Sequence, residues 1–327
     1  MASKIEQSWY NRPSLLTLLL LPFGLLFGLL SNIRRLLYKL GLSQVYKAPV
    51  PVIIVGNISV GGNGKTPFVL WLVPFLEALG LKVGIISRGY GANPPSTPFL
   101  VTKDTSTEQG GDEPSLLAQR LGCPVMIGSN RQASIEQLLR NHEIDIIVSD
   151  DGLQHYQLAR DIEFCIVDAE RKFGNGLWMP AGPLRELPKR LNSVDLAIYN
   201  GGVSTYSYSL EASGFFHVAD DTHAAERQNK GVSVCAIGNP ARFENTLREK
   251  GVELVGCQHF ADHHPYQASD FTQFGEDAIF MTEKDAVKCR TFAKDNWYYL
   301  RVDAKPTQAL EQAVIELLKK KEIYHGL

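Results

Sequence analysis

The sequence predicts an α/β protein with a mainly parallel sheet of the P-loop NTPase type, helices on both faces, a second, smaller α/β lobe and an N-terminal hydrophobic helix. Three observations indicate this architecture. Short apolar runs alternate with helical stretches between residues 51 and 199. A glycine-rich loop ending in Gly64-Lys65-Thr66 directly follows the first run. Residues 13–33 carry no charged side chain. The length of 327 residues suits two domains.

The uncharged run predicts a membrane-associated helix. It has 21 residues, and ten leucines and two phenylalanines lie within residues 15–30. As a helix it would be about 31 Å long, close to the roughly 30 Å hydrocarbon core of a bilayer. A cleaved signal peptide is the weaker alternative, because the run is long for one and has no small-x-small cleavage site. A buried core helix is the other. Because Pro22, Gly24 and Gly28 interrupt the run and favour a bend, it stays open whether the helix spans the bilayer or only dips into one leaflet.

The charges beside this run predict its orientation. Arg34, Arg35 and Lys39 follow it, so the positive-inside rule places the remainder of the chain in the cytoplasm. The five scattered cysteines are typical of free thiols in a reducing compartment. With 33 Lys+Arg against 35 Asp+Glu, the net charge of −2 offers no footprint for nucleic acid. We expect no nucleic-acid partner, and nothing indicates an obligate protein partner.

The remaining elements follow in order. Between the predicted strands at 51–56, 83–87, 125–128, 144–149, 164–168 and 196–199 lie helical patterns at 65–79, 113–121 and 131–140. Alternating polar and apolar residues at 205–218 predict a two-stranded ribbon. The polar stretch 219–230 suggests a boundary. We therefore expect a membrane-associated segment at 1–45, a kinase-like core with its ribbon at 46–228, and a smaller lobe at 229–327, with strands at 232–237, 278–281 and 297–302 and a final helix at 307–321.

The glycine-rich loop predicts an ATP site. Its glycines let backbone N–H groups surround phosphate, Lys65 reaches the β- and γ-phosphates, and the Thr66 hydroxyl ligates Mg²⁺. Ser59 stands where the common pattern has its first glycine, and an incidental glycine-rich turn is the alternative. The predicted ATP-binding residues are Ser59, Val60, Gly61, Gly62, Asn63, Gly64, Lys65 and Thr66.

A pair of carboxylates predicts the metal side of the same site. Asp150 and Asp151 end the strand predicted at 144–149, and such an Asp in an open α/β sheet lies beside the phosphate loop. The alternative is a turn, because Asp-Asp-Gly is also good turn chemistry. Which of the two faces the metal stays open.

Eight motifs together resemble the tetraacyldisaccharide 4'-kinase family, the lipid A kinases of Gram-negative bacteria. Each is weak alone, but their order along the whole chain is specific. They are the loop at 59–67, Ser87-Arg88-Gly89-Tyr90-Gly91, Gly111-Asp112-Glu113-Pro114, Asn130-Arg131, Asp150-Asp151-Gly152-Leu153-Gln154-His155, Pro180-Ala181-Gly182-Pro183-Leu184-Arg185-Glu186, Phe260-Ala261-Asp262-His263-His264 and Thr282-Glu283-Lys284-Asp285.

The resemblance implies a reaction and a location. The γ-phosphate of ATP would be transferred to the 4'-hydroxyl of a tetraacylated glucosamine disaccharide 1-phosphate, giving lipid IVA. The resemblance also implies two lobes joined by a β-ribbon and a place on the cytoplasmic face of the bacterial inner membrane. Four acyl chains make such an acceptor insoluble, so the enzyme would meet it at the bilayer, held there by the basic residues 34–39.

The resemblance further implies residue roles. Asp112 matches the family's catalytic carboxylate and His263 its assisting histidine, with Lys65 as the catalytic lysine; Arg185 matches a nucleotide-site arginine, and Glu186 and Gln154 lie with the metal site. By local rules Asp112 is a helix N-cap, His263 a loop histidine, and Arg185 with Glu186 a surface ion pair. His264 is an alternative to His263. Placed on separate lobes, Asp112 and His263 would meet by lobe closure.

Two other functions are compatible with a phosphate loop. A membrane-associated ATPase switch of the partitioning type would carry a further lysine ahead of the glycines, where this chain has Val60. A kinase for a soluble cofactor or nucleoside would have no need of the leucine-rich helix. GTPases usually carry an Asn-Lys-x-Asp motif, which is missing from the sequence.

Overall fold

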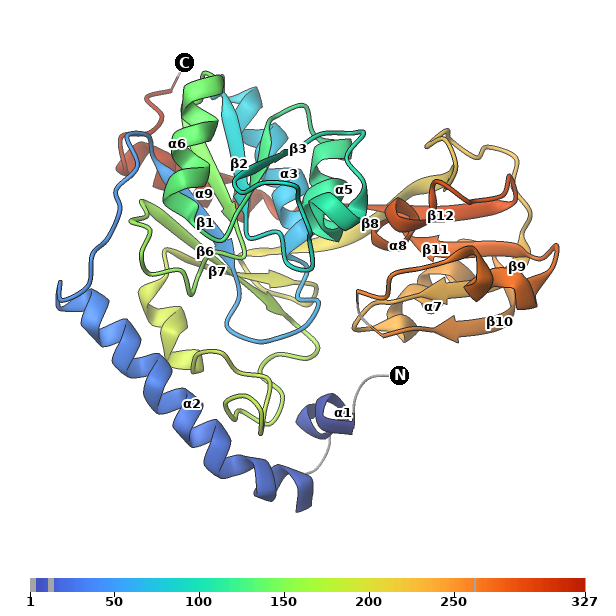
Figure 1. Ribbon diagram of the computed structural model, residues 1–327, viewed down its shortest axis with the longest axis horizontal. Helices are drawn as coiled ribbons and strands as arrows, with labels where there is room; N and C mark the ends of the chain where they lie inside the picture. The colour runs from blue at the N-terminus through green and yellow to red at the C-terminus, as the bar shows by residue number, and fades with distance from the viewer. Residues whose placement is uncertain (1–3, 11–14, 262, 327) are drawn as a thin grey trace.

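A computed structural model describes residues 4–10, 15–261 and 263–326 and shows one large mixed sheet (Figure 1). Pro13, Ser14 and Asp262, which belong to the predicted hydrophobic run and to one quoted motif, lie outside the described residues. Twelve strands among the described residues follow the order β10-β9-β11-β12-β8-β7-β6-β1-β5-β2-β4-β3. All neighbouring pairs are parallel except β8 with β12 and β3 with β4.

The strands have these bounds: β1 Val52–Gly56, β2 Val83–Ser87, β3 Phe99–Val101, β4 Val125–Ile127, β5 Ile146–Asp150, β6 Ile162–Asp168, β7 Leu196–Asn200, β8 Ser207–His217, β9 Lys230–Cys235, β10 Glu253–His259, β11 Ala278–Thr282 and β12 Trp297–Pro306. The α-helices are α1 Lys4–Tyr10, α2 Leu15–Lys39, α3 Lys65–Ala78, α4 Thr107–Gly110, α5 Asp112–Arg120, α6 Arg131–Asn141, α7 Pro240–Glu249, α8 Glu283–Cys289 and α9 Gln308–Lys320, with 3₁₀ turns at Pro188–Ser193 and Ala268–Phe274.

The larger lobe buries both faces of its parallel strands. Along β1, Ile53 and Val55 pack with α3, α5 and α9 on one face, while Val52 and Ile54 pack with α6 on the other. All five residues of β1 are buried, which explains why the strand is continuously apolar rather than alternating. The predicted mainly parallel sheet with helices on both faces is confirmed.

The predicted ribbon forms, but between segments distant in sequence. Residues 207–217 are a single strand, β8, and its antiparallel partner is β12, with Tyr208 opposite Pro306 and His217 opposite Tyr298. The alternating pattern at 205–218 therefore belongs to one strand of the ribbon. Because β8 also pairs with β7, and β12 with β11, the ribbon joins the two parts of the sheet into one.

The smaller lobe contains β9, β10 and β11 with α7 and α8, and lies to one side of the ribbon (Figure 1). The chain then returns, since Leu310, Val314 and Leu318 of α9 are buried in the core of the larger lobe. Residues 308–320 thus pack with the larger lobe although they fall within the segment 229–327. The proposed divisions at 45 and 228 remain predictions.

Helix α2 runs without interruption through Pro22 and lies along the outside of the larger lobe (Figure 1). Its buried residues are Thr17, Gly24 and Gly28, while most of its leucines are exposed, Leu25 and Leu29 by 54% and 57%. A Cβ atom at Gly28 would lie 2.3 Å from Trp178, so the glycines let the helix approach that ring. The exposed leucines do not fit the buried core helix considered as an alternative. Residues 15–39 are long and apolar enough to cross a membrane.

Candidate active site

One large cavity, of about 1670 Å³, holds most of the predicted site residues. The phosphate loop forms one wall, with Val60, Gly61, Gly62, Asn63, Gly64, Lys65 and Thr66. Phe27, Leu30 and Arg34 of α2 line a second part of it, and His263 and Lys284 of the smaller lobe a third. The phosphate loop, α2 and the smaller lobe therefore all line one cavity, as a site that holds both a nucleotide and a large acceptor requires.

The phosphate loop is held by contacts from the ends of neighbouring strands. Tyr208 donates a hydrogen bond from its hydroxyl to the Gly64 carbonyl at 2.6 Å, and the Asn200 amide donates to the Asn63 carbonyl at 3.2 Å. Gly64 has φ 92°, and a Cβ there would lie 2.3 Å from the Tyr208 hydroxyl. Only glycine fits this position. No described side chain caps α3, so its first N–H groups can bind phosphate.

Ser59 is a structural part of the loop. It forms a β-bridge with Leu184, and its carbonyl and hydroxyl oxygens accept from the Asn63 amide at 3.1 and 3.2 Å. The backbone φ of Ser59 is not positive, so this position does not require the glycine that the common pattern has here. The departure at Ser59 therefore leaves the shape of the loop intact.

Lys65 and Arg185 meet at one carboxylate. The Lys65 Nζ lies 3.6 Å from Asp151 Oδ1, and the Arg185 guanidinium lies 3.0 and 3.1 Å from the two Asp151 oxygens. Burial raises the pKa of Asp151, but Lys65 and Arg185 outweigh it and hold that pKa below its usual value. Both cations and this carboxylate thus converge at the head of α3.

Asp150 differs from its neighbour Asp151, because no described residue donates a hydrogen bond to its carboxylate. It is 1% exposed, and among the described residues neither carboxylate oxygen accepts a hydrogen bond. Burial, followed by the charge of Glu113, raises its pKa to about 7. A buried carboxylate without donors is costly unless a cation neutralises it. Asp150 at the end of β5, with the Thr66 hydroxyl on the cavity wall, therefore fits a divalent cation.

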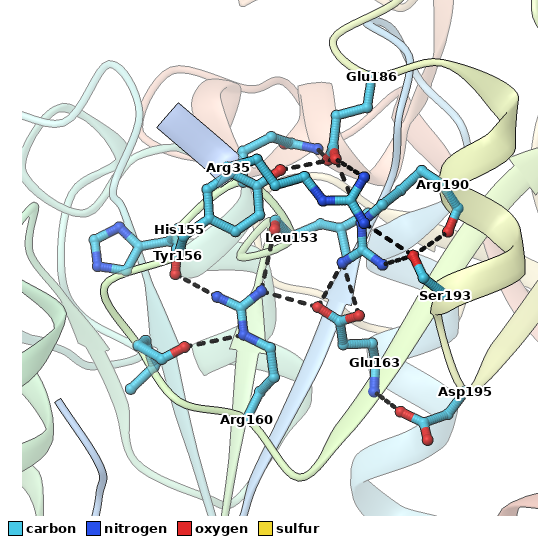
Figure 2. A network of polar contacts seen from close by, with 12 residues as sticks. Arg35, Leu153, His155, Tyr156, Arg160, Glu163, Glu186, Arg190, Ser193 and Asp195 are labelled. Atoms are coloured by element: carbon cyan, nitrogen blue, oxygen red, sulfur yellow. Dashed lines mark hydrogen bonds and ion pairs between the residues drawn. The ribbon is translucent and has the colours of Figure 1, made fainter. Parts of the chain in front are cut away.

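Glu186 belongs to a network of polar contacts (Figure 2), and Gln154 is one of its partners. One Glu186 oxygen accepts from the Gln154 amide at 2.8 Å; the other accepts from the Tyr156 hydroxyl at 2.7 Å and lies 3.3 Å from Arg190 Nε. Arg35 of α2 reaches the same oxygen at 3.9 Å. With both oxygens engaged by protein donors, Glu186 holds Gln154 in this structure, and its place in the metal site remains a prediction.

The network extends under the site through a second carboxylate. Figure 2 shows Arg160 and Arg190 converging on Glu163, at 2.9 Å and at 2.6 to 2.7 Å. Arg160 also donates to the carbonyls of Leu153 and His155, which fixes the segment after Asp151. Burial and four nearby arginines lower the pKa of His155, which lines the cavity, to about 4. His155 is therefore neutral at pH 7.

Asp112 and His263, 151 residues apart in the chain, are hydrogen-bonded in the structure. The His263 Nδ1 lies 2.9 Å from Asp112 Oδ2, and the Asp112 side chain is 14% exposed. The N-cap of α5 is Gly111, with φ 79°, so Asp112 begins the helix and its carboxylate is not a cap. Burial raises the pKa of Asp112, but His263, Lys288 and Lys284 together hold it below its usual value.

The second histidine of the doublet has a different partner. His264 lies 3.0 Å from Asp270 and stacks on Phe260 with ring centroids 4.4 Å apart. His263 lines the cavity and contacts the ring of Tyr90. This arrangement favours His263 over His264 as the partner of Asp112.

Some residues around the pair carry no signal in the sequence. Lys288 reaches Asp112 Oδ2 at 2.9 Å but reads locally as an ordinary helix lysine, and no local pattern pairs Tyr90 with His263. Lys284 lies 3.3 Å from Glu113, and Asp285 is fully buried at the start of α8. The tertiary contact between α5 and α8 brings Lys284, Asp285 and Lys288 to the site, and Tyr90 reaches it from the loop after β2.

Comparison with known proteins gives the family. Residues 16–319 match the family described as Tetraacyldisaccharide-1-P 4'-kinase. The chain belongs to this family. A tetraacyldisaccharide 4'-kinase of Pseudoalteromonas translucida is 54% identical, over 99% of this chain and 100% of the relative. One of Haemophilus influenzae is 50% identical, over 93% of each.

A solved structure of the tetraacyldisaccharide 4'-kinase family has the same fold. It is the LpxK protein of Aquifex aeolicus in complex with ATP, which superposes with a TM-score of 0.76 at 28% identity, covering 93% of this chain and 99% of that one. The prediction of the family from eight short motifs is confirmed. The comparisons do not support the partitioning-type switch considered as an alternative, which would carry a lysine where this chain has Val60.

Proposed function

We propose that this chain transfers the γ-phosphate of ATP to the 4'-hydroxyl of a tetraacyldisaccharide 1-phosphate, the step that forms lipid IVA. The observation that carries the proposal is the Asp112–His263 pair, whose His263 opens onto the same cavity as the phosphate-loop Lys65. ATP would bind with its phosphates at the loop and α3, and Lys65 and Arg185 would balance their negative charge.

The chain's own residues account for the proton and the charge. Asp112 would accept the proton of the attacking hydroxyl, and His263 would orient the carboxylate. Lys65 contacts Asp151 in the structure and would move to the β- and γ-phosphates, stabilising charge on the transferred group. Thr66 and Asp150 would hold Mg²⁺, with Asp151 and Gln154 nearby. When bound, Mg²⁺ neutralises phosphate charge.

A direct assay tests this function. We expect the protein, incubated with labelled ATP, Mg²⁺ and tetraacyldisaccharide 1-phosphate in detergent, to give a labelled bisphosphorylated lipid. A protein that binds ATP but yields no labelled lipid would contradict the proposal. A soluble hexosamine 1-phosphate, which lacks the acyl chains, serves as the second acceptor. A sugar kinase would phosphorylate it, whereas a lipid kinase would not.

The membrane face is also a proposal. The exposed leucines of α2 would insert in the cytoplasmic side of the inner membrane, and Lys39 would meet anionic head groups. Arg34 lines the cavity and Arg35 contacts Glu186, so two of the three basic residues near the end of α2 face the protein. They would serve the site rather than the bilayer.

The proposed cation site predicts a selective loss of Mg²⁺ affinity. In Asp150→Asn we expect the Mg²⁺ concentration for half-maximal turnover to rise by about 10- to 100-fold, the usual range for disturbed metal sites. Turnover measured against Mg²⁺ concentration checks this. Asp145→Asn, just before β5 and bonded to the Lys82 backbone at 2.8 Å, is the control. Equal Mg²⁺ dependence in both variants would exclude Asp150 from the site.

A further inference from the structure

Lys288 is a buried lysine that contacts Asp112, the candidate base. It lies on α8 in the smaller lobe, and its side chain is 4% exposed. Its Nζ lies 2.9 Å from Asp112 Oδ2 and donates to the His264 carbonyl at 3.2 Å. A buried ammonium is unfavourable unless charged and polar groups surround it. The fold therefore provides a specific site for this cation against Asp112.

The two donors to Asp112 contact the same oxygen. Both His263 Nδ1 and Lys288 Nζ lie 2.9 Å from Oδ2. The other oxygen, Oδ1, accepts no hydrogen bond from the described residues. Two donors on one oxygen fix the direction of the carboxylate and leave its second oxygen for another partner.

Lys288 is itself held in place by Asp285, three residues earlier on the same helix. Asp285 Oδ2 accepts from the Thr282 hydroxyl at 2.6 Å and from the Ala236 backbone N–H at 3.2 Å, which fixes the start of α8 to the end of β9. Asp285 Oδ1 lies 3.9 Å from the Lys288 Nζ. The ring of Tyr266 lies 5.6 Å from the same nitrogen. Lys288 thus approaches Asp112 from a rigid position.

We propose that Lys288 is a positioning residue for phosphoryl transfer, which holds Oδ2 of Asp112 so that Oδ1 faces the acceptor hydroxyl. The proposal rests on the proposed kinase function. Asp112 then has two partners from the smaller lobe, His263 and Lys288. It also gives a role to the Thr282-Glu283-Lys284-Asp285 motif, since Asp285 places the helix that carries Lys288.

The same arrangement predicts a pH effect. Among the described residues, the charged and titratable groups facing Asp112 are His263, Lys288 and Lys284, which lower its pKa, together with the neighbouring carboxylate Glu113. Without the charge of Lys288 the pKa of Asp112 rises. Because the base acts when deprotonated, the acid side of the pH profile of kcat then moves to higher pH.

Lys288→Met and Lys288→Arg test the proposal in the full-length protein with ATP and the tetraacyldisaccharide 1-phosphate. In Lys288→Met we expect kcat to fall about 10- to 100-fold, as for a misplaced catalytic group. We also expect the acid limb, meaning the acid side of the pH profile of kcat, to move to higher pH by about one unit or more. The affinity for ATP should stay within about twofold, because no contact of Lys288 reaches the phosphate loop. Lys288→Arg should keep the acid limb in place and recover most of kcat.

The matched control is Arg120→Met. Arg120 joins the same two helices through Glu283 at 2.9 Å but does not touch Asp112. We expect it to lower thermal stability with the acid limb unmoved. If Lys288 only ties α5 to α8, Lys288→Met will behave like Arg120→Met, and the proposal is overturned. Should Lys288→Met not fold, Lys288→Gln, which keeps a donor without the charge, gives the same test.

The outcomes separate this proposal from the proposed function. A wild-type protein without lipid kinase activity would overturn the function itself. An active wild type with an unchanged acid limb in Lys288→Met would overturn only the role of Lys288.

Discussion

Asp112→Asn is expected to lower kcat by about 10²- to 10⁴-fold, the usual contribution of a general base. The amide keeps the size of the side chain but cannot accept the proton of the attacking hydroxyl. ATP affinity should change little, since the contacts of Asp112 are to His263 and Lys288 rather than to the phosphate loop. Steady-state kinetics with both substrates, combined with nucleotide binding at equilibrium, measures the two effects separately.

Asp270→Asn is the matched control for this experiment. Asp270 contacts His264 at 3.0 Å, almost the same geometry as Asp112 with His263, but His264, unlike His263, is not among the residues that line the cavity. We expect its kcat to stay within about twofold of wild type. A large loss in both variants would indicate that the Asp–His pairs only stabilise the structure, and Asp112 would lose its proposed role.

Lys65→Met is expected to reduce kcat/KM for ATP by about 10²- to 10³-fold, the range for removing one group that stabilises transition-state charge. Unlike the change at Asp112, it should weaken nucleotide binding as well as turnover. Lys65 is one of two cations facing Asp151, with Arg185 the other, so some phosphate binding should persist. Nucleotide titration and kinetics on the same preparation check both effects.

Lys82→Met provides the comparison for Lys65. Lys82 lies in the same lobe and pairs with Glu143 on the surface, where its side chain is 60% exposed. Its loss should leave ATP binding and turnover unchanged within about twofold, because exposed ion pairs contribute little. If Lys65→Met binds ATP as tightly as Lys82→Met does, the loop does not bind phosphate as proposed.

The larger lobe was predictable because its signals are local. Buried strands such as β1 are continuous apolar runs, and the glycines of the phosphate loop mark the start of α3. Edge strand β10 was missed, because its residues alternate only between exposed and partly exposed positions and leave no clear apolar pattern. The pairing of β8 with β12 was missed because about 80 residues separate the two strands.

The residues of the candidate site were predictable only where they belong to the motifs that resemble the family. Local rules describe Asp112 as a helix cap, yet Gly111 occupies that position in the structure. The resemblance implies a metal-site role for Glu186, which remains a prediction, while its contacts with Gln154, Tyr156 and Arg190 are visible only in the structure. Lys288 has no motif of its own, and its role arises from the packing of α8 on α5. Lobe closure was expected to bring Asp112 to His263, but the pair is already in contact.

The return of α9 to the larger lobe has a consequence for biosynthesis. Leu310, Val314 and Leu318 complete a core whose first strand is synthesised some 250 residues earlier. The smaller lobe is in effect an insertion within the larger one, so the core of the phosphate-binding lobe cannot be completed until residues 310–318 have been synthesised. Helix α2 emerges long before that moment. With α2 inserted in the membrane as proposed above, the nascent protein reaches the bilayer before its nucleotide-binding lobe is complete.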